Sequence, residues 1–173
     1  MKKRFLPSMY KKNIFEINYE LLKKNGIKCL LFDVDNTISP AKERKLCDKT
    51  KKLFDKLKND FKIILFSNNI EKRIRKFSSF YDVEFESLSL KPLYFKYSKI
   101  LRKSGFKKSE IAAIGDQIVT DIYGGNKAGI TTILVDPMSK VEGKTTSINR
   151  VIERQIINNY KKKNIFVKGK YYE

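Results

Sequence analysis

The sequence predicts an α/β fold in which a parallel β-sheet is covered by helices on both faces. Short apolar runs alternate along the chain with segments whose apolar residues recur at helical spacing. Strands that are separated by single helices lie parallel to one another, with helices packed on both faces of the sheet. Polar residues follow several of these runs directly, and in such sheets ligands bind beyond the carboxyl ends of the strands. We therefore expect any chemistry at that edge of the sheet.

Five apolar runs and four periodic segments make up this alternating core. The predicted strands are residues 28–34, 61–66, 83–85, 111–114 and 131–135. The predicted helices are residues 46–58, 69–80, 92–104 and 119–128. Asn69 suits a helix N-cap, Pro92 suits a first helical turn, and Gly105 and Gly129 suit helix ends.

The two ends of the chain differ from this core. Residues 1–15 mix lysine and arginine with large apolar side chains, within a basic N-terminal segment that spans residues 1–27. Residues 147–163 are predicted to form a basic amphipathic helix, and residues 165–167 a short terminal strand. The apolar face of that helix consists of Ile148, Val151, Ile152, Ile156 and Tyr160. Both ends suit contact with an anionic bilayer, and the alternative is that both pack against the domain, which we favour for the C-terminal helix.

The length of 173 residues is enough for one domain with a sizeable core, which we place at residues 1–173. The net charge is +19, from 38 basic and 19 acidic residues. A field of this sign attracts phosphorylated substrates, nucleic acid or anionic membranes, although lysine spread over every surface would give the same charge.

The composition excludes several classes of chemistry. The chain has no histidine, which rules out a Ser-His-Asp triad, a histidine-ligated zinc site and phosphohistidine chemistry. Neither Cys29 nor Cys47 is followed closely by the arginine that a cysteine phosphatase needs. Two cysteines also predict no disulfide framework and a reducing cytoplasm. We find no apolar run of about 18–20 residues and no secretory signal.

Four polar clusters come at or just after predicted strands, and a parallel sheet would bring them to one edge. They are Asp33-Val34-Asp35-Asn36-Thr37, Ser67-Asn68-Asn69, Lys91-Pro92, and Gly115-Asp116 with Asp121. Each cluster has a commonplace alternative, such as a turn, a helix cap or a surface lysine. A calcium loop at Asp33 is excluded, because Ile38 and Arg44 stand where that loop needs Gly and Glu. The specificity therefore lies in the order and spacing of all four clusters.

This set of side chains suits hydrolysis of a phosphate monoester. Asp33 and Asp35 are two residues apart, so an extended strand would place both on one face. One carboxylate can attack phosphorus while the other transfers protons at the leaving oxygen. Asp116 adds an oxygen ligand for a hard cation such as Mg²⁺, and Mn²⁺ would suit the same oxygens. Ser67 and Lys91 offer a hydroxyl and a positive charge to the phosphoryl oxygens.

The order of the clusters resembles the haloacid dehalogenase (HAD) superfamily. Its DxDxT signature is matched by Asp33, Asp35 and Thr37, and its later motifs by Ser67, by Lys91 and by Gly115-Asp116 with Asp121. The match covers residues 28–135. Segments over nearly the whole chain, among them Phe5-Leu6-Pro7 and Gly26-Ile27-Lys28, resemble the YqeG-type HAD IIIA phosphatases, which are related to phosphatidylglycerophosphate phosphatases.

The resemblance implies a three-layer Rossmann-like sandwich and a role for each motif residue. Asp33 would be the nucleophile, and Asp35 would protonate the leaving oxygen and then activate water. The side chains of Asp33 and Asp116 and the backbone carbonyl of Asp35 would bind Mg²⁺, with Asp121 in support. The implied phosphate-binding residues are Ser67, Asn68, Lys91 and Thr37, of which Thr37 would also steady the nucleophile loop.

The spacing of the motifs adds that no cap domain is expected. Only 29 residues separate Thr37 from Ser67, and only 23 separate Ser67 from Lys91. The site should therefore be open to a large substrate, or covered by an oligomer partner.

Phosphatidylglycerophosphate is the leading substrate hypothesis, with the protein in the cytoplasm and in peripheral contact with the inner face of an anionic membrane. A soluble sugar phosphate, nucleotide or phosphorylated macromolecule is the alternative substrate. A basic nucleic-acid-binding protein on the same fold is the third hypothesis, although no clustered RNA-binding motif supports it.

Overall fold

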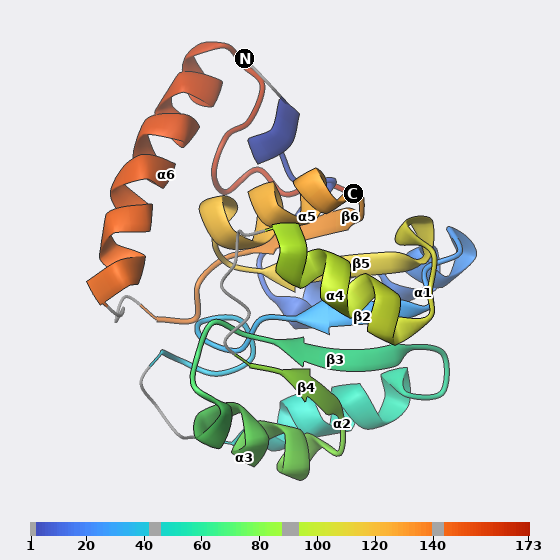
Figure 1. Cartoon of the computed structure of the whole chain (residues 1–173). Helices are drawn as coiled ribbons and strands as arrows, with labels where there is room; N and C mark the ends of the chain where they lie inside the picture. The colour runs from blue at the N-terminus through green and yellow to red at the C-terminus, as the bar shows by residue number, and fades with distance from the viewer. Residues whose placement is uncertain (1–2, 42–45, 88–93, 140–143) are drawn as a thin grey trace.

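The computed structural model describes residues 3–41, 46–87, 94–139 and 144–173, and it contains one six-stranded parallel sheet (Figure 1). The order of strands across the sheet is β1-β6-β5-β2-β3-β4. The strands are β1 (Met9–Lys11), β2 (Cys29–Phe32), β3 (Lys62–Phe66), β4 (Glu84–Glu86), β5 (Ile111–Gly115) and β6 (Thr131–Val135). The predicted parallel α/β sheet is confirmed.

Helices cover both faces of this sheet. They are α1 (Tyr19–Lys24), α2 (Asp48–Leu57), α3 (Glu71–Tyr81), α4 (Tyr94–Ser104), α5 (Tyr123–Ala128) and α6 (Lys144–Lys162). Single helical turns add Lys3–Phe5, Ile14–Glu16 and Lys108–Glu110, and a π-helical turn at Ile118–Ile122 leads into α5. None of the described helices combines the length and apolar character that a membrane span needs.

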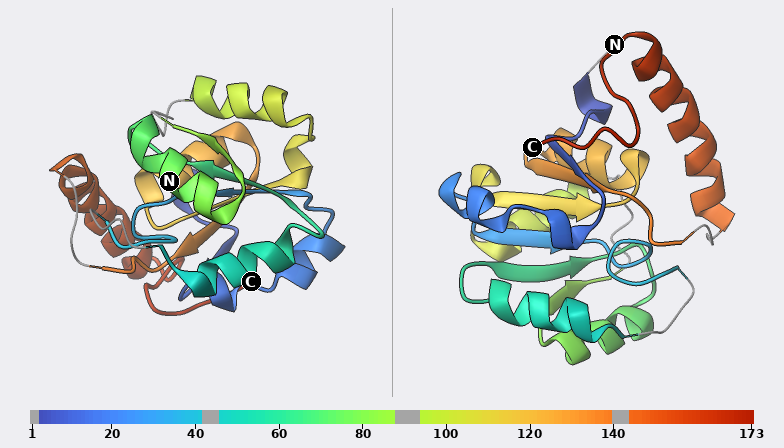
Figure 2. Two further views of the ribbon diagram at one scale, coloured as in Figure 1. Left: turned by 90° about the horizontal axis from the view of Figure 1, so that it is seen from below. Right: turned by 180° about the vertical axis from the view of Figure 1, so that it is seen from behind.

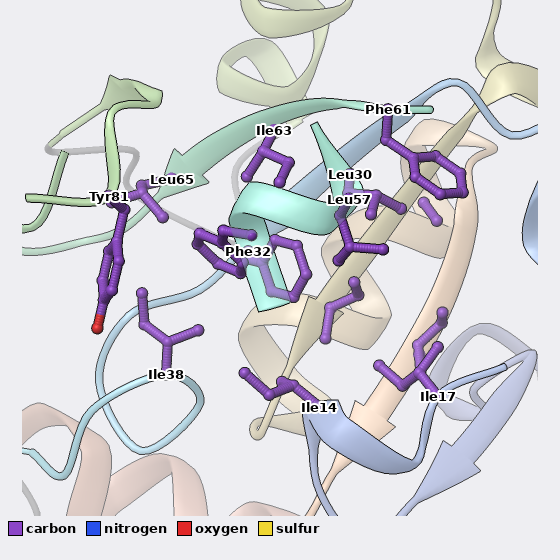
Figure 3. Close-up of a cluster of buried hydrophobic side chains, with 14 of the residues drawn as sticks. Ile14, Ile17, Leu30, Phe32, Ile38, Leu57, Phe61, Ile63, Leu65 and Tyr81 are labelled. Carbon is purple, nitrogen blue, oxygen red and sulfur yellow. The ribbon is translucent and has the colours of Figure 1, made fainter. Parts of the chain in front are cut away.

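Alternation along the central strand divides the core into two layers. Leu30 and Phe32 of β2 face the side covered by α1, α2 and α3, where they lie beside Leu57 of α2 (Figure 3). Phe54 of α2 is fully buried on the same side. Cys29 and Leu31 face the opposite side, which α4 and α5 cover. Both faces of each inner strand are therefore apolar, as is typical of strands in a buried parallel sheet.

A third cluster closes the β1–β6 edge of the sheet. Tyr10 of β1 is fully buried there, against Tyr160 of α6 and Phe166 after it. Tyr172 forms an antiparallel bridge to Tyr10, so the last residues of the chain run beside β1 (Figure 2). The alternative in which the ends pack against the domain is thus the one observed for Tyr10, Ile14 and Tyr160.

Two local predictions are wrong, and one strand was not predicted. Residues 9–11 were not predicted as a strand, because three residues are too few to show a period of two. Residues 165–167 form no strand, and the C-terminal bridge to Tyr10 is made by Tyr172. Asn69 is not the N-cap of α3, which begins after Ile70.

Only part of the apolar face predicted for the C-terminal helix is buried. Tyr160 is buried and Ile156 partly buried, whereas Val151 is 50% exposed and Ile152 is 43% exposed. The side chain of Ile148 lies outside the described residues. Between Ile152 and Tyr160, the buried residue is acidic: it is Glu153.

Candidate active site

The pairing of β2 with β5 brings two of the predicted aspartates together. Phe32 lies opposite Ile114 in the register, and the amide of Asp33 donates to the carbonyl oxygen of Ile114 (2.9 Å). Asp33 and Asp116 therefore leave the ends of neighbouring strands. From β2 the chain continues to β3 and β4 on one side, and then returns to β5 and β6 on the other. The two aspartates thus stand at the topological switch point, where open α/β sheets bind ligands.

Asp33, Asp116 and Asp121 form a buried carboxylate cluster. One oxygen from each side chain lies within 4.8 Å of the others, and the three residues are 7%, 3% and 3% exposed. Burial raises the pKa of Asp116; the Arg150 guanidinium opposes that shift, whereas the charges of Asp33 and Asp121 add to it. Carboxylates this close repel one another when charged, and a positive charge between them would relieve that repulsion.

One oxygen of the cluster has no partner within the described chain. Oδ1 of Asp116 is buried and accepts no hydrogen bond, although a buried carboxylate oxygen is normally satisfied. A set of carboxylate oxygens, one of them buried without a hydrogen bond, suits a hard divalent cation. The residues present therefore fit a metal ion, with Asp33, Asp116 and Asp121 as the side chains able to hold it.

Gly115 allows Asp121 to enter the cluster. A Cβ atom at Gly115 would lie 2.3 Å from Cγ of Asp121, so any side chain there would collide with the carboxylate. The amide of Gln117 donates to Oδ2 of Asp121 (3.1 Å) and fixes it over the glycine. The hydroxyl of Tyr97, from α4, donates to the carbonyl oxygens of Thr120 and Asp121 (3.3 Å each) and so stabilises the π-helical turn. Such turns occur often at functional sites.

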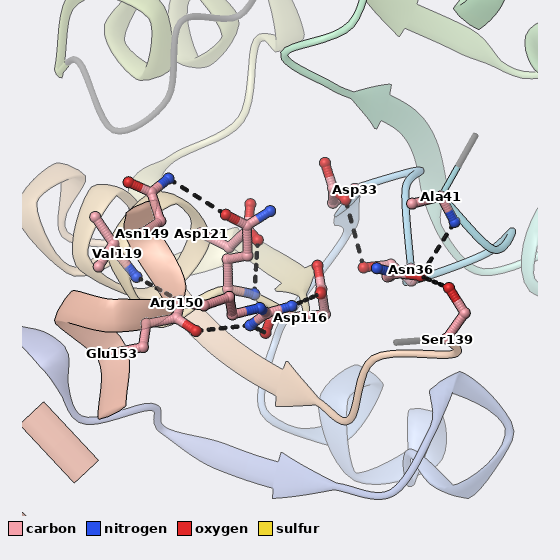
Figure 4. A network of polar contacts seen from close by, with 12 residues as sticks. Asp33, Asn36, Ala41, Asp116, Val119, Asp121, Ser139, Asn149, Arg150 and Glu153 are labelled. Atoms are coloured by element: carbon pink, nitrogen blue, oxygen red, sulfur yellow. Dashed lines mark hydrogen bonds and ion pairs between the residues drawn. The ribbon is translucent and has the colours of Figure 1, made fainter. Parts of the chain in front are cut away.

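The loop after β2 turns sharply at Asn36, whose φ of 62° is left-handed. Its side-chain oxygen accepts hydrogen bonds from the amide of Ala41 (3.1 Å) and the hydroxyl of Ser139 (2.8 Å), which hold that conformation (Figure 4). Thr37 is buried, and its hydroxyl donates a long hydrogen bond to Oδ2 of Asp33 (3.5 Å). This contact is compatible with the predicted steadying role of Thr37.

Asp35 is only partly buried and is held by two residues near the start of α3. Nη2 of Arg73 donates to Oδ1 of Asp35 (2.6 Å), and Nδ2 of Asn69 donates to Oδ2 (3.0 Å). Both oxygens of Asp35 are thus held by side chains from the connection between β3 and β4. The sequence offered Asn69 as a helix cap and gave no sign of Arg73.

The remaining predicted phosphate-binding residues are placed only in part. Ser67 follows β3 and is 1% exposed, with its amide bonded to the carbonyl oxygen of Glu86 (3.1 Å) and its hydroxyl accepting from the amide of Asn69 (3.2 Å). Asn68 is exposed. Lys91 lies outside the described residues.

Arg150 is the residue that sequence reasoning missed most clearly. This α6 side chain forms an ion pair with Oδ2 of Asp116, and its Nη1 donates to the backbone carbonyl of the same residue (2.9 Å) (Figure 4). Glu153, one helical turn further, pairs with Arg150 (2.6 Å). A basic residue and an acidic one three positions apart are visible in the sequence, but nothing there connects the helix with the aspartates.

Two family models divide the chain between them. A model described as mitochondrial PGP phosphatase matches residues 1–84, which carry Asp33 and Ser67, and one described as HAD-hydrolase-like matches residues 90–145, which carry Asp116 and Asp121. The fold and the carboxylate cluster at the switch point thus define a HAD-type phosphatase, a class of metal-dependent enzymes.

A relative from Bacillus subtilis (strain 168), called probable phosphatase YqeG, is 35% identical over 164 residues, which cover 94% of this chain and 95% of the relative. The chain belongs to the YqeG family of HAD phosphatases. The resemblance drawn from the motifs is therefore confirmed.

Two further proteins are more distant. A chloroplastic and mitochondrial phosphatidylglycerophosphate phosphatase 1 from Arabidopsis thaliana is 25% identical over 147 residues, which cover 79% of this chain and 42% of the relative. This chain thus spans less than half of that relative's length. The putative HAD-hydrolase YfnB from Bacillus subtilis, solved with bound magnesium, superposes with a TM-score of 0.56 at 15% identity, over 69% of this chain and 91% of that one. This likeness shows the shared fold.

Proposed function

We propose that this protein is a Mg²⁺-dependent phosphomonoesterase that works through an aspartyl phosphate on Asp33, with phosphatidylglycerophosphate as its substrate. The observation that carries the proposal is the buried cluster of Asp33, Asp116 and Asp121, with one Asp116 oxygen left without a hydrogen bond. Such a cluster at strand ends suits an ion that neutralises the charge of a phosphoryl group next to a carboxylate nucleophile.

In the first step, a carboxylate oxygen of Asp33 attacks phosphorus. The new O–P bond forms as the ester P–O bond breaks, and Asp35 gives its proton to the departing alcohol oxygen. The contacts of Asp35 with Arg73 and Asn69 hold it in a fixed orientation within the loop that carries the nucleophile. Orientation of this kind supplies much of the rate of a displacement at phosphorus.

In the second step, water attacks the phosphorus of the aspartyl phosphate. Asp35, now ionised, takes the proton from that water, and the bond between phosphorus and Asp33 breaks. Inorganic phosphate leaves and both carboxyl groups return to their starting states. When bound, Mg²⁺ supplies charge neutralisation at the phosphoryl oxygens, and Ser67, Asn68 and Lys91 are the proposed side-chain ligands of those oxygens.

Three observations support a phospholipid substrate. One is the match of residues 1–84 to the PGP phosphatase model, and a second is the Arabidopsis relative. The third is that no cap domain interrupts the described parts of the connections from Thr37 to Ser67 and from Ser67 to Glu86, which contain α2, β3, α3 and β4. An uncapped site accepts a headgroup that remains attached to a bilayer.

Exposed apolar side chains near the site add to this support. Ile70 is 59% exposed and follows Asn69, which bonds Asp35. Met138 is 47% exposed, and its amide donates to the carbonyl oxygen of Asn36 (2.9 Å). Large apolar side chains beside a polar site suit an amphiphilic substrate. We propose that they, rather than the buried residues of the N-terminal segment, meet the lipid in a peripheral contact.

The test is phosphate release from phosphatidylglycerophosphate in mixed micelles, beside a panel of soluble sugar phosphates and nucleotides. We expect fast turnover of the lipid with Mg²⁺, and loss of turnover in EDTA and in Asp33→Asn. Asn68→Ala, which alters an exposed residue at the same edge, is expected to retain more activity than Asp33→Asn.

Other outcomes would separate the parts of the proposal. Turnover of soluble esters alone would leave the aspartate chemistry in place and remove the lipid assignment. Tight RNA binding without Mg²⁺-dependent turnover of any ester would contradict the proposed function as a whole.

A further inference from the structure

Arg150 reaches the carboxylate cluster from outside the sheet. It belongs to α6, which packs along the β1–β6 edge through Ile156, Ile157 and Tyr160. Its guanidinium contacts Asp116 twice, at the backbone carbonyl and at Oδ2, and its side chain is 15% exposed while that of Asp116 is fully buried. The planar fork of a guanidinium fixes the orientation of a group that it contacts at two points.

Glu153 holds Arg150 in this place. Its Oε2 accepts from Nη1 of Arg150 (2.6 Å), and its Oε1 accepts from the amide of Val119 in the π-helical turn (3.2 Å). Glu153 is 3% exposed, so this acidic residue is buried only because both of its oxygens are satisfied. Asn149 adds a hydrogen bond to the side chain of Gln117 (3.4 Å). Side chains of three α6 residues, Asn149, Arg150 and Glu153, thus bond to the segment from Asp116 to Val119.

Because of this ion pair, the two side-chain oxygens of Asp116 have different surroundings. Arg150 occupies Oδ2, and Oδ1 is the buried oxygen without a hydrogen bond. We propose that Arg150, oriented by Glu153, is a positioning residue that fixes Asp116 so that Oδ1 is presented as the ligand for the divalent cation. This inference rests on the proposed metal-dependent function and deepens it, because it assigns part of the metal site to α6.

Two other roles for Arg150 give different outcomes. A purely structural brace between α6 and the sheet would affect stability without changing metal affinity. A guanidinium that competes with the cation for Asp116 would weaken metal binding, so its removal would tighten binding. A positioning role makes removal weaken binding, since loss of groups that orient metal ligands typically costs about 10- to 100-fold in affinity.

The experiment measures Mn²⁺ binding to the full chain without substrate, by electron paramagnetic resonance, and Mg²⁺ binding by calorimetry. The variants are Arg150→Met, Arg150→Lys and the matched control Arg154→Met, which removes the same charge from an exposed position of the same helix. We expect Kd to rise about 10- to 100-fold in Arg150→Met, to recover in part in Arg150→Lys, and to change less than about twofold in Arg154→Met. Glu153→Gln should weaken binding in the same direction, and it replaces Arg150→Met if that variant does not fold.

Unchanged or tighter metal binding in folded Arg150→Met would overturn the inference, and so would equal effects of Arg150→Met and Arg154→Met. The wild-type protein distinguishes this failure from that of the proposed function. If the wild type binds Mn²⁺ and hydrolyses phosphate esters while Arg150→Met binds the ion normally, only the role of Arg150 falls. If the wild type neither binds the ion nor hydrolyses an ester, the proposed function falls with it.

Discussion

At the scale of single residues, the site depends on one glycine that has no room for a side chain. Gly115 ends β5, and a Cβ atom there would lie 2.3 Å from Cγ of Asp121, well inside contact distance. Gly115→Ala should displace Asp121 from the cluster, lowering kcat at least about tenfold and destabilising the fold by about 1–3 kcal/mol through overpacking. Steady-state kinetics and urea unfolding would measure both effects.

Gly169→Ala is the control for Gly115→Ala. Gly169 has a φ of 87° with open space around its Cβ position, so alanine there should lower stability without changing kcat. Wild-type kcat in Gly115→Ala would contradict the role given to Asp121.

Arg73 is the second residue whose substitution should lower kcat, because it orients Asp35, the proposed general acid and base. Its ion pair with Asp35 is 2.6 Å long, and its side chain is 13% exposed. Arg73→Met should lower kcat about 10- to 100-fold through loss of orientation, while metal affinity stays near the wild-type value. Arg75→Met, on the exposed side of the same helix, is the matched control and should leave kcat unchanged. Equal kcat values for the two variants would show that Asp35 needs no such support.

The residues of the site were predictable to different degrees. Asp33 and Asp116 could be found because each directly follows a strand, and Asp121 because its spacing from Asp116 matches the acidic motif of the family. The parallel sheet then brings the strand ends together. Arg73, Arg150 and Glu153 could not, since their roles depend on how α3 and α6 pack, which no local pattern encodes. The individual catalytic and phosphate-binding roles, including that of Lys91, stay predictions.

At the scale of elements, β1 shows how a segment that looks membrane-active can be structural. Tyr10 is fully buried, and its hydroxyl donates to Asp136 (2.5 Å) and accepts from the amide of Gly169 (3.2 Å). Asn126 of α5 donates to the carbonyl oxygens of Arg4 and Leu6 (2.9 and 2.8 Å). Arg4 and Lys11 lie among apolar side chains that are buried or partly buried at this edge of the sheet.

Tyr10→Ala should therefore destabilise the protein by about 3–5 kcal/mol, the usual cost of deleting a buried aromatic side chain. Tyr171→Ala is the matched control, because Tyr171 also bonds Asp136 (2.7 Å) but is 42% exposed. Urea unfolding would compare the two, and a loss below about 1 kcal/mol in Tyr10→Ala would contradict the packing of β1.

The core strands and helices were predictable from periodicity, and most of their bounds agree with the structure to within a few residues. The failures share a physical cause. Tertiary contacts override local preference in each case. They form the three-residue strand β1, they bury Glu153 on α6, and they engage Asn69 with Asp35 rather than as the cap of α3.

At the scale of the whole molecule, the two cysteines report on its packing. Cys29 lies in the central strand with no exposed surface, and burial raises its pKa to about 12. Cys47 is partly exposed at the start of α2. Because the thiolate is the reactive form, iodoacetamide at pH 8 should modify Cys47 and spare Cys29 until the protein is unfolded. Peptide mass spectrometry would detect the difference, and early labelling of Cys29 would contradict the burial of β2 in the centre of the sheet.

The single-domain organisation over residues 1–173 stays a prediction, but the structure shows how both ends serve the same unit. The N-terminal strand completes the sheet, the C-terminal residues bridge to it, and α6 carries Arg150 to the carboxylates. The proposed chemistry therefore draws on the whole length of the chain rather than on the motif core alone.

The most direct test of the central claim is the capture of the phosphorylated enzyme. The protein is mixed with phosphatidylglycerophosphate and Mg²⁺, quenched in acid within the first turnover, digested and analysed by mass spectrometry. We expect one phosphoryl group on the peptide that contains Asp33, absent in EDTA and absent in Asp33→Asn. Phosphorylation at another residue, or rapid turnover of the ester by Asp33→Asn, would show that Asp33 is not the nucleophile.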